Sequence, residues 1–118
     1  MDPVRARIVQ FFEIIPGRFP ALDDLDDLKD KRVREKIEIR ILRAKQGNYG
    51  THRRIGDFIE LIADFGPGHR IYLGEDGAVL IIILVVGDKS TQVRDFKEAN
   101  AYWEAYKGRK RRGTSHAA

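Results

Sequence analysis

The sequence contains no cysteine, which excludes a disulfide framework and thiolate metal sites. A chain without cysteine suits the reducing cytoplasm, and we expect a cytoplasmic protein. Long apolar runs are also missing, since the unbroken run Ala78–Val86 falls far short of the roughly 20 residues that a membrane-spanning helix needs. The N-terminal segment has an acidic second residue, Asp2, and no long apolar core, so we expect no signal peptide.

Motifs of cofactor-dependent enzymes are absent as well. The sequence has no Walker phosphate-binding loop, no glycine fingerprint for dinucleotides and no zinc-protease helix motif. Its three histidines, His52, His69 and His116, do not have the spacing of a metal site. We therefore expect neither a cofactor nor a metal ion.

Acidic residues are missing from the C-terminal end, where none follows Glu104. Of the formal net charge of +4, five positive charges lie in this end, which leaves about −1 for residues 1–106. These cations are Lys107, Arg109, Lys110, Arg111 and Arg112. We expect one domain over residues 1–107 and a basic, disordered tail over residues 108–118. The tail is either a solvated end or an arm that attracts RNA through the last four of these cations.

The most informative stretch spans residues 65–92, with the sequence FGPGHRIYLGEDGAVLIIILVVGDKSTQ. Gly66-Pro67-Gly68 predicts a turn, and the β-forming residues His69–Leu73 predict a strand. Asp76-Gly77 is typical of a hairpin turn, and the apolar run that follows it predicts a buried strand. Polarity then changes abruptly in a loop that opens a helix, which is a place where functional groups are held rigidly.

The remaining patterns predict two strands and three helices. The strands are expected at residues 5–15 and 58–65, and the helices at residues 21–30, 33–45 and 91–107. In the second strand the odd-numbered residues from Ile59 to Phe65 are expected to face the core. The resulting order, β-α-α-β-β-β-α, predicts an α+β domain with a small antiparallel sheet, two N-terminal helices and a C-terminal helix.

Two cations near the central turn are candidates for a binding site. Arg70 lies within a predicted strand, where a charge either pairs with Glu60 or Asp64 or faces an open groove and binds phosphate. Lys89 lies at the start of the last helix and is either a solvated loop lysine or part of an anion site with the helix amides. A further short basic cluster consists of His52, Arg53 and Arg54.

The motifs GPGHRIY and GDKSTQ together resemble the killer-protein branch of the RelE/ParE toxin superfamily, the HigB-like addiction-module toxins. RILRAKQGNYG upstream is similar to a helix end and turn of the same family, and Glu60-Leu61 fits the start of its Glu-Leu-Arg strand motif. The resemblance covers about residues 23–106, and the RelE-like fold that it implies has the same element order as the pattern predicts.

The resemblance implies a toxin of a type II toxin–antitoxin system that cleaves mRNA on the ribosome without a metal ion, with the ribose 2′-OH as nucleophile. The expected partners are a helix-turn-helix antitoxin, mRNA and the ribosome, with no membrane and with room for a higher-order toxin–antitoxin complex. By motif, Arg70, Lys89 and Gln92 are the candidate catalytic residues, joined by His69 as a possible titrating group. His52, Arg53, Arg54 and the tail are the candidate RNA-binding residues.

Three residues depart from the family pattern. Ile62 stands where the Glu-Leu-Arg motif has arginine, His69 replaces a tyrosine, and Val86 replaces a glycine. The loss of a cation from a phosphate site weakens electrostatic stabilisation of a transition state. A non-enzymatic gyrase inhibitor of the ParE type, or an inactive relic that only binds its antitoxin, therefore remains an alternative to the nuclease.

Overall fold

The fold was analysed in a computed structural model, which describes the backbone of residues 6–117 and the side chains of residues 6–112. Its elements are β1 (Ile8–Phe11), α1 (Pro20–Asp26), α2 (Lys31–Lys45), β2 (His52–Ile55), β3 (Phe58–Ala63), β4 (His69–Asp76), β5 (Leu80–Asp88), a 3-10 turn η1 (Lys89–Thr91) and α3 (Gln92–Ala117). The predicted α+β class is confirmed, and so are the two N-terminal helices and the C-terminal helix.

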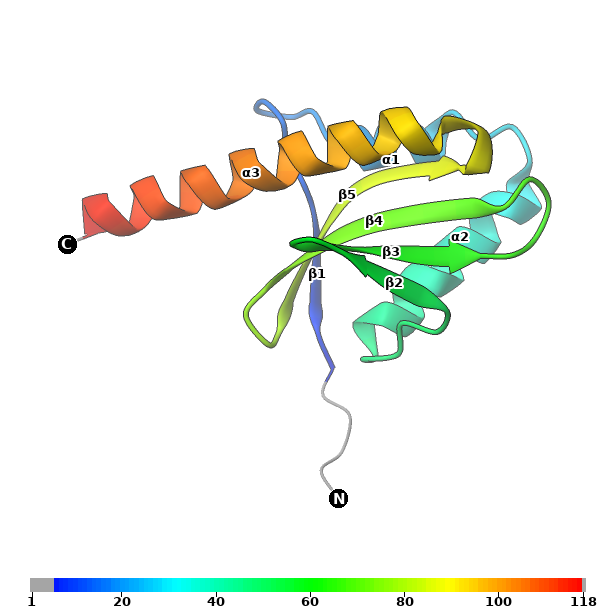
Figure 1. The fold of residues 1–118 in the computed structure, drawn as a ribbon, viewed down its shortest axis with the longest axis horizontal. Coiled ribbons are helices and arrows are strands. Elements are labelled where there is room, and N and C mark those ends of the chain that lie inside the picture. Colours follow the sequence, from blue (N-terminus) through cyan, green and yellow to red (C-terminus); the bar gives the residue numbers. More distant parts are fainter. Residues whose placement is uncertain (1–5, 118) are drawn as a thin grey trace, which may run out of the picture.

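The strands form one sheet in the order β1-β5-β4-β3-β2 (Figure 1). The pairs β2–β3, β3–β4 and β4–β5 are antiparallel, whereas β1 is parallel to β5. The sheet is therefore mixed, whereas we predicted an antiparallel sheet. Two helices and three strands separate β1 from β5 in the chain, and such a long connection allows two neighbouring strands to be parallel. Strand β2 was not predicted, since its sequence, HRRI, is basic and does not alternate.

Each face of the sheet is covered by helices. Helices α1 and α2 pack on one face against Ile59, Leu61 and Ile71, in a core that also includes Ile37 and Ile83. Helix α3 runs along the other face, where the core includes Phe58, Tyr72 and Trp103 (Figure 1). Strand β5 contributes to both cores, which explains its apolar sequence. The predicted core-facing alternation of β3 is confirmed for Ile59, Leu61 and Ala63.

Helix α3 continues past Lys107 to Ala117, whereas we expected a disordered tail from residue 108. Lysine and arginine are good helix formers, so the basic composition does not stop the helix. The helix also gains tertiary contacts in this region, because Arg109 binds the backbone carbonyls of Glu13 and Ile14. Over residues 6–117, none of the helices has the length and apolar character needed to cross a membrane.

Candidate phosphate-binding site

The turn between β3 and β4 brings Gly68 close to both Arg70 and Lys89. A Cβ atom at Gly68 would lie 3.3 Å from Nη1 of Arg70 and 3.6 Å from Cβ of Lys89. The backbone N–H of Lys89 donates to the Gly68 carbonyl at 2.9 Å, which ties the end of β5 to this turn. Gly68 has a φ of 78°, a left-handed conformation that favours glycine. The sequence motif GPG thus shapes the turn beside which the Arg70 guanidinium and the base of the Lys89 side chain lie.

Arg70 has no acidic partner within the described part of the chain. Its Nη1 donates to the carbonyl of His69 at 3.1 Å, and its buried Nε has no hydrogen-bond partner there. The predicted alternative, an ion pair with Glu60 or Asp64, is not formed. A half-buried guanidinium without a carboxylate is costly unless something neutralises it, so this site suits an anion.

Glu60 is instead held by two other side chains. The carboxylate is 1% exposed and accepts hydrogen bonds from Nε of Arg53 at 2.6 Å and from Nε2 of Gln92 at 2.9 Å. Burial alone would raise the pKa of Glu60, but these hydrogen bonds outweigh it and hold the pKa below its ordinary value. The hydrogen bond from Gln92 therefore connects the start of α3 to β3. Glu60 in turn connects both elements to Arg53 on the edge strand β2.

The amide groups at the entry of α3 are already occupied. The side chain of Asp88 accepts hydrogen bonds from the backbone N–H of Ser90 at 2.7 Å and of Thr91 at 3.2 Å, as in a capping box. Our suggestion that these amides join Lys89 in binding an anion is therefore not supported by the geometry. The positive charge of the site rests on the Arg70 guanidinium and the exposed Lys89 ammonium.

His69 lies on the other side of the sheet from Arg70. Neighbouring residues of a strand point to opposite faces, and the His69 ring packs 5.2 Å from the ring of Phe65 beside the α1–α2 core. His69 is 4% exposed, and its Nε2 has no hydrogen-bond partner among the described residues. The structure separates it from the two cations, so we leave His69 out of the site.

The predicted basic cluster on β2 is divided between two faces. Arg53 reaches Glu60 on the α3 face, whereas Arg54 pairs with Glu75 at 2.9 Å. Glu75 also accepts from Arg7 and from Tyr49, both at 2.7 Å. Its pKa is about 2, because these hydrogen bonds outweigh the opposing effect of burial. His52 is exposed and lies edge-on to the Tyr49 ring. These residues therefore do not gather in one patch, and their role in RNA binding stays a prediction.

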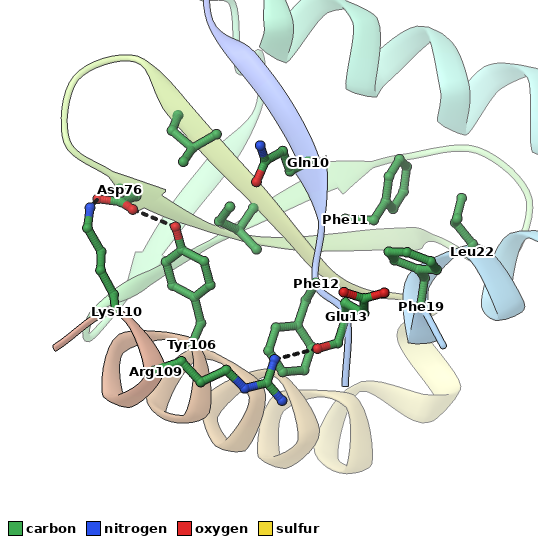
Figure 2. A pocket seen from close by; sticks show the side chains of 12 residues that line it. Gln10, Phe11, Phe12, Glu13, Phe19, Leu22, Asp76, Tyr106, Arg109 and Lys110 are labelled. Atoms are coloured by element: carbon green, nitrogen blue, oxygen red, sulfur yellow. Dashed lines mark hydrogen bonds and ion pairs between the residues drawn. The ribbon is translucent and has the colours of Figure 1, made fainter. Parts of the chain in front are cut away.

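The tail cations also contact the body of the protein. Arg109 lies 5.0 Å over the ring of Phe12 (Figure 2), although we expected a disordered tail here. Lys110 pairs with Asp76, and Arg111 and Arg112 are exposed. The basic residues are therefore distributed around the C-terminal half of α3, and two of them, Lys107 and Lys110, pair with carboxylates. Their proposed role in RNA binding stays a prediction.

The burial of two aspartates, one fully and one half-buried, was not predicted from the sequence. Asp95 is 1% exposed and lies so close to Gly87 that a Cβ atom there would overlap its carboxylate. Asp24, in an acidic run that we expected to face water, accepts a hydrogen bond from the Val86 N–H at 2.9 Å. Burial raises the pKa of Asp24 to about 6. Gly87 was the only available signal, since glycine inside an apolar strand often marks a close approach.

Possible metal ligands do not gather in the described residues, where no group of three or more His, Asp or Glu side chains is arranged to hold a metal ion. Near Gly68 the described chain offers two cations, Arg70 and Lys89. Such groups bind a phosphodiester and stabilise charge that develops on it.

Comparison with known proteins relates this chain to a protein of Haemophilus influenzae. That protein, described as uncharacterized, is 46% identical to this chain over 76 residues, which make up 64% of this chain and 77% of that protein. The chain belongs to the family of this Haemophilus protein. No activity comes with this membership, because the relative's description names none. No protein-family model matches the chain, and no solved structure matches it.

Proposed function

We propose that the protein is a HigB-like toxin of the RelE/ParE superfamily that cleaves mRNA on the ribosome. The observation that carries the proposal is Arg70, a half-buried arginine without an acidic partner among the described residues, placed beside Lys89 by the GPG turn. The scissile phosphate binds to Arg70, and Lys89 shares the charge of the phosphorane. Gln92 acts through Glu60 as a positioning residue, because its amide is committed to that carboxylate.

Cleavage of a defined message on programmed ribosomes tests this proposal. Arg70→Ala should lower the cleavage rate by roughly a hundred- to a thousand-fold, the usual effect of removing one electrostatic group. Arg18→Ala is the matched control, since Arg18 is an exposed arginine far along the chain whose pair with Asp23 spans 3.4 Å. Equal rates for wild type and Arg70→Ala would refute the assignment, provided that both proteins are folded.

A second candidate function is favoured by one observation. The position next to Arg70 across the sheet is Ile62, where the family motif has an arginine. A site with fewer cations suits a protein that acts by binding alone, as the ParE-like gyrase inhibitors do. Trapped gyrase–DNA complexes together with intact mRNA would support this alternative over the nuclease.

We also propose that the protein has an antitoxin as its partner and acts in the cytoplasm. A helix-turn-helix antitoxin would bind the toxin in the cytoplasm, where its ribosomal target lies. Co-expression with the product of the adjacent reading frame, followed by size-exclusion chromatography, tests this part. Separate elution of the two proteins would contradict it without bearing on cleavage.

A further inference from the structure

Two arginines on the α3 face of the sheet differ in their acidic partners. Arg70 of β4 has no carboxylate within the described chain, so its charge is available to a phosphate. Arg53 of β2 lies beside the buried Glu60, whose carboxylate accepts a hydrogen bond from Nε of Arg53 at 2.6 Å. Because this pair neutralises Arg53, a second anion would gain little from its charge.

The outer side of the Arg53 guanidinium is open. Its Nη1 and Nη2 groups form no hydrogen bond within the described part of the chain, and the side chain is 56% exposed. A guanidinium is planar, and its N–H groups point in fixed directions. Glu60 is itself held by Gln92, so β3 and α3 together orient the group. The outward pair of N–H groups suits a ligand that offers two adjacent acceptors.

An exposed aromatic ring of α3 borders the same surface. Phe96 is 39% exposed, and its ring packs on Phe58 of β3 with 5.4 Å between the ring centroids. Phe58 precedes Glu60 by two residues and lies on the same face of β3. Val93, three residues before Phe96, is 75% exposed on the same flank of the helix. Arg53 and Phe96 therefore lie on either side of a surface with Glu60 and Phe58 buried beneath it.

This surface adjoins the candidate phosphate site. Helix α3 packs mainly on β5 and β4, so β3 and β2 extend beyond it on this face of the sheet (Figure 1). Arg53 is the cross-strand partner of Glu60, and Glu60 is the partner of Tyr72, two residues from Arg70 on β4. Strand spacing and rise then place the Cα atoms of Arg53 and Arg70 about 12 Å apart. Two long side chains shorten that span, so a ligand with its phosphate at Arg70 reaches Arg53 with an adjoining group.

The carboxylates that border this surface already have donors. Both oxygens of Glu60 accept hydrogen bonds, one from Arg53 and one from Gln92. Asp57, in the turn between β2 and β3, is bound by Lys107 at 2.8 Å. The open N–H groups of Arg53 therefore stay available to a ligand that brings its own acceptors.

We propose that Arg53 and Phe96 form a guanine-binding subsite for the nucleotide of RNA next to the phosphate at Arg70. The base stacks on Phe96, and the two Nη groups of Arg53 donate to its O6 and N7. Adenine has a donor in place of O6, so the same pair of N–H groups rejects it. An apolar protein segment would cover the ring but leave the Arg53 donors unpaired, which is unfavourable. The inference rests on the proposed function, because it takes RNA as the ligand.

Binding of short RNA probes tests the subsite without measuring cleavage. The probes are fluorescein-labelled pentamers of 2′-O-methyluridine with guanine, adenine, cytosine or uracil at the central position, and their blocked 2′ oxygens prevent cleavage. Fluorescence anisotropy should show the guanine probe bound about tenfold or more tighter than the adenine probe. The pyrimidine probes should also bind more weakly than the guanine probe, because they offer Phe96 a smaller ring. Equal affinities, or no binding of any probe, would overturn the inference, whereas cleavage on the ribosome decides the nuclease proposal separately.

Two analogues of guanine identify the atoms that are contacted. 7-Deazaguanine lacks the N7 acceptor and should lose most of the preference, whereas hypoxanthine keeps both O6 and N7 and should bind as guanine does. These probes use the wild-type protein, so the result does not depend on the folding of a variant. A 7-deazaguanine probe that binds as tightly as the guanine probe would contradict the contact with Arg53.

Replacement of Arg53 by lysine tests the pair of N–H groups. Arg53→Lys keeps a positive charge beside Glu60 but loses the parallel donors, and should reduce the guanine preference to about twofold or less. Arg34→Lys is the matched control, because Nε of Arg34 also donates to a glutamate, Glu38, but on α2 at the opposite face of the sheet. Arg70→Ala should weaken all four probes by a similar factor, since a phosphate contact is the same for every base. An unchanged preference in folded Arg53→Lys would overturn the inference.

Phe96→Leu tests the stacking contact while keeping an apolar side chain on Phe58. It should weaken binding of all four probes about fivefold or more, whereas Phe96→Tyr keeps the aromatic face and should not. The same variants distinguish a protein ligand from RNA. If Phe96→Leu and Arg53→Lys leave RNA binding unchanged but abolish co-elution with the product of the adjacent reading frame, the surface binds a protein and the inference is overturned.

Discussion

Ile62 and Arg70 are direct partners across the antiparallel pair β3–β4, with Gly87 on the far side of Arg70 in β5. The position at which the toxin motif has arginine is therefore the nearest cross-strand neighbour of the candidate phosphate-binding arginine. A cation at position 62 would enter the same site rather than a separate patch. The replacement of the motif's arginine by Ile62 therefore directly affects the candidate phosphate-binding site.

Ile62→Arg should raise RNA cleavage by about tenfold while lowering stability by up to about 1 kcal/mol, because like charges directly opposite each other repel until an anion binds between them. Ile62→Gln is the control for side-chain polarity without charge. Ribosomal cleavage rates and thermal unfolding would be measured for both variants. The idea fails if Ile62→Arg cleaves no faster than Ile62→Gln.

The second prediction concerns the hydrogen bond that Gln92 of α3 donates to Glu60 of β3. Gln92→Ala removes one hydrogen bond to the buried Glu60 and should cost about 1 kcal/mol of unfolding free energy. Gln92→Glu should cost more, since it places a second carboxylate beside one whose pKa lies below its ordinary value. Denaturant unfolding measures both effects. Equal stabilities for the two variants would show that the side chain at 92 faces solvent.

Several features of the fold were predictable because each depends on local sequence. The alternation of β3, the apolar run of β5 and the turn glycines predicted the elements around Arg70. The hairpin between β4 and β5 pairs Arg70 with Gly87, so the nearness of Arg70 and Lys89 could be predicted from the Asp76-Gly77 turn. The position of His69 and Arg70 on opposite faces of the sheet was also predictable, because the side chains of adjacent residues in a strand point to opposite faces.

Other features depend on contacts between distant segments and left no local signal. The parallel pairing of β1 with β5 and the pairing of β2 with β3 are set by the whole sheet. The division of Arg53 and Arg54 between Glu60 and Glu75 depends on that unexpected strand. The acidic run around Asp24 has the composition of a solvated helix, so the burial of one of its members could not be recognised.

Two glycines should respond oppositely to alanine. A Cβ atom at Gly74 would overlap the ring of Trp103, so Gly74→Ala should destabilise the protein by about 1–3 kcal/mol. At Gly108, inside α3, the nearest atom is the end of the Arg112 side chain at 3.5 Å. Gly108→Ala should therefore stabilise the protein by up to about 1 kcal/mol. No gain at Gly108 in thermal unfolding would argue that α3 is not helical beyond Lys107.

The last prediction concerns Asp24 and pH. Burial, opposed by the Val86 N–H and reinforced by nearby Asp95 and Glu98, raises the pKa of Asp24 from 3.8 to about 6. Between these values the folded protein binds more protons at this carboxyl than the unfolded chain does. Its contribution to stability is therefore present at low pH and is lost as the pH rises through about 6.

Asp24→Asn removes this loss while keeping an oxygen that can accept from the Val86 N–H. Between pH 4.5 and pH 7 the unfolding free energy of the variant should rise by about 1–2 kcal/mol relative to that of the wild type. This gain is smaller than the full shift in the Asp24 pKa implies, because solvent screens a half-buried group. Asp27→Asn, an exposed position in the same acidic run, is the control and should show no such gain. Urea unfolding across this pH range provides the measurement. Parallel pH profiles for wild type and Asp24→Asn would show that the Asp24 carboxyl remains solvated in the folded protein.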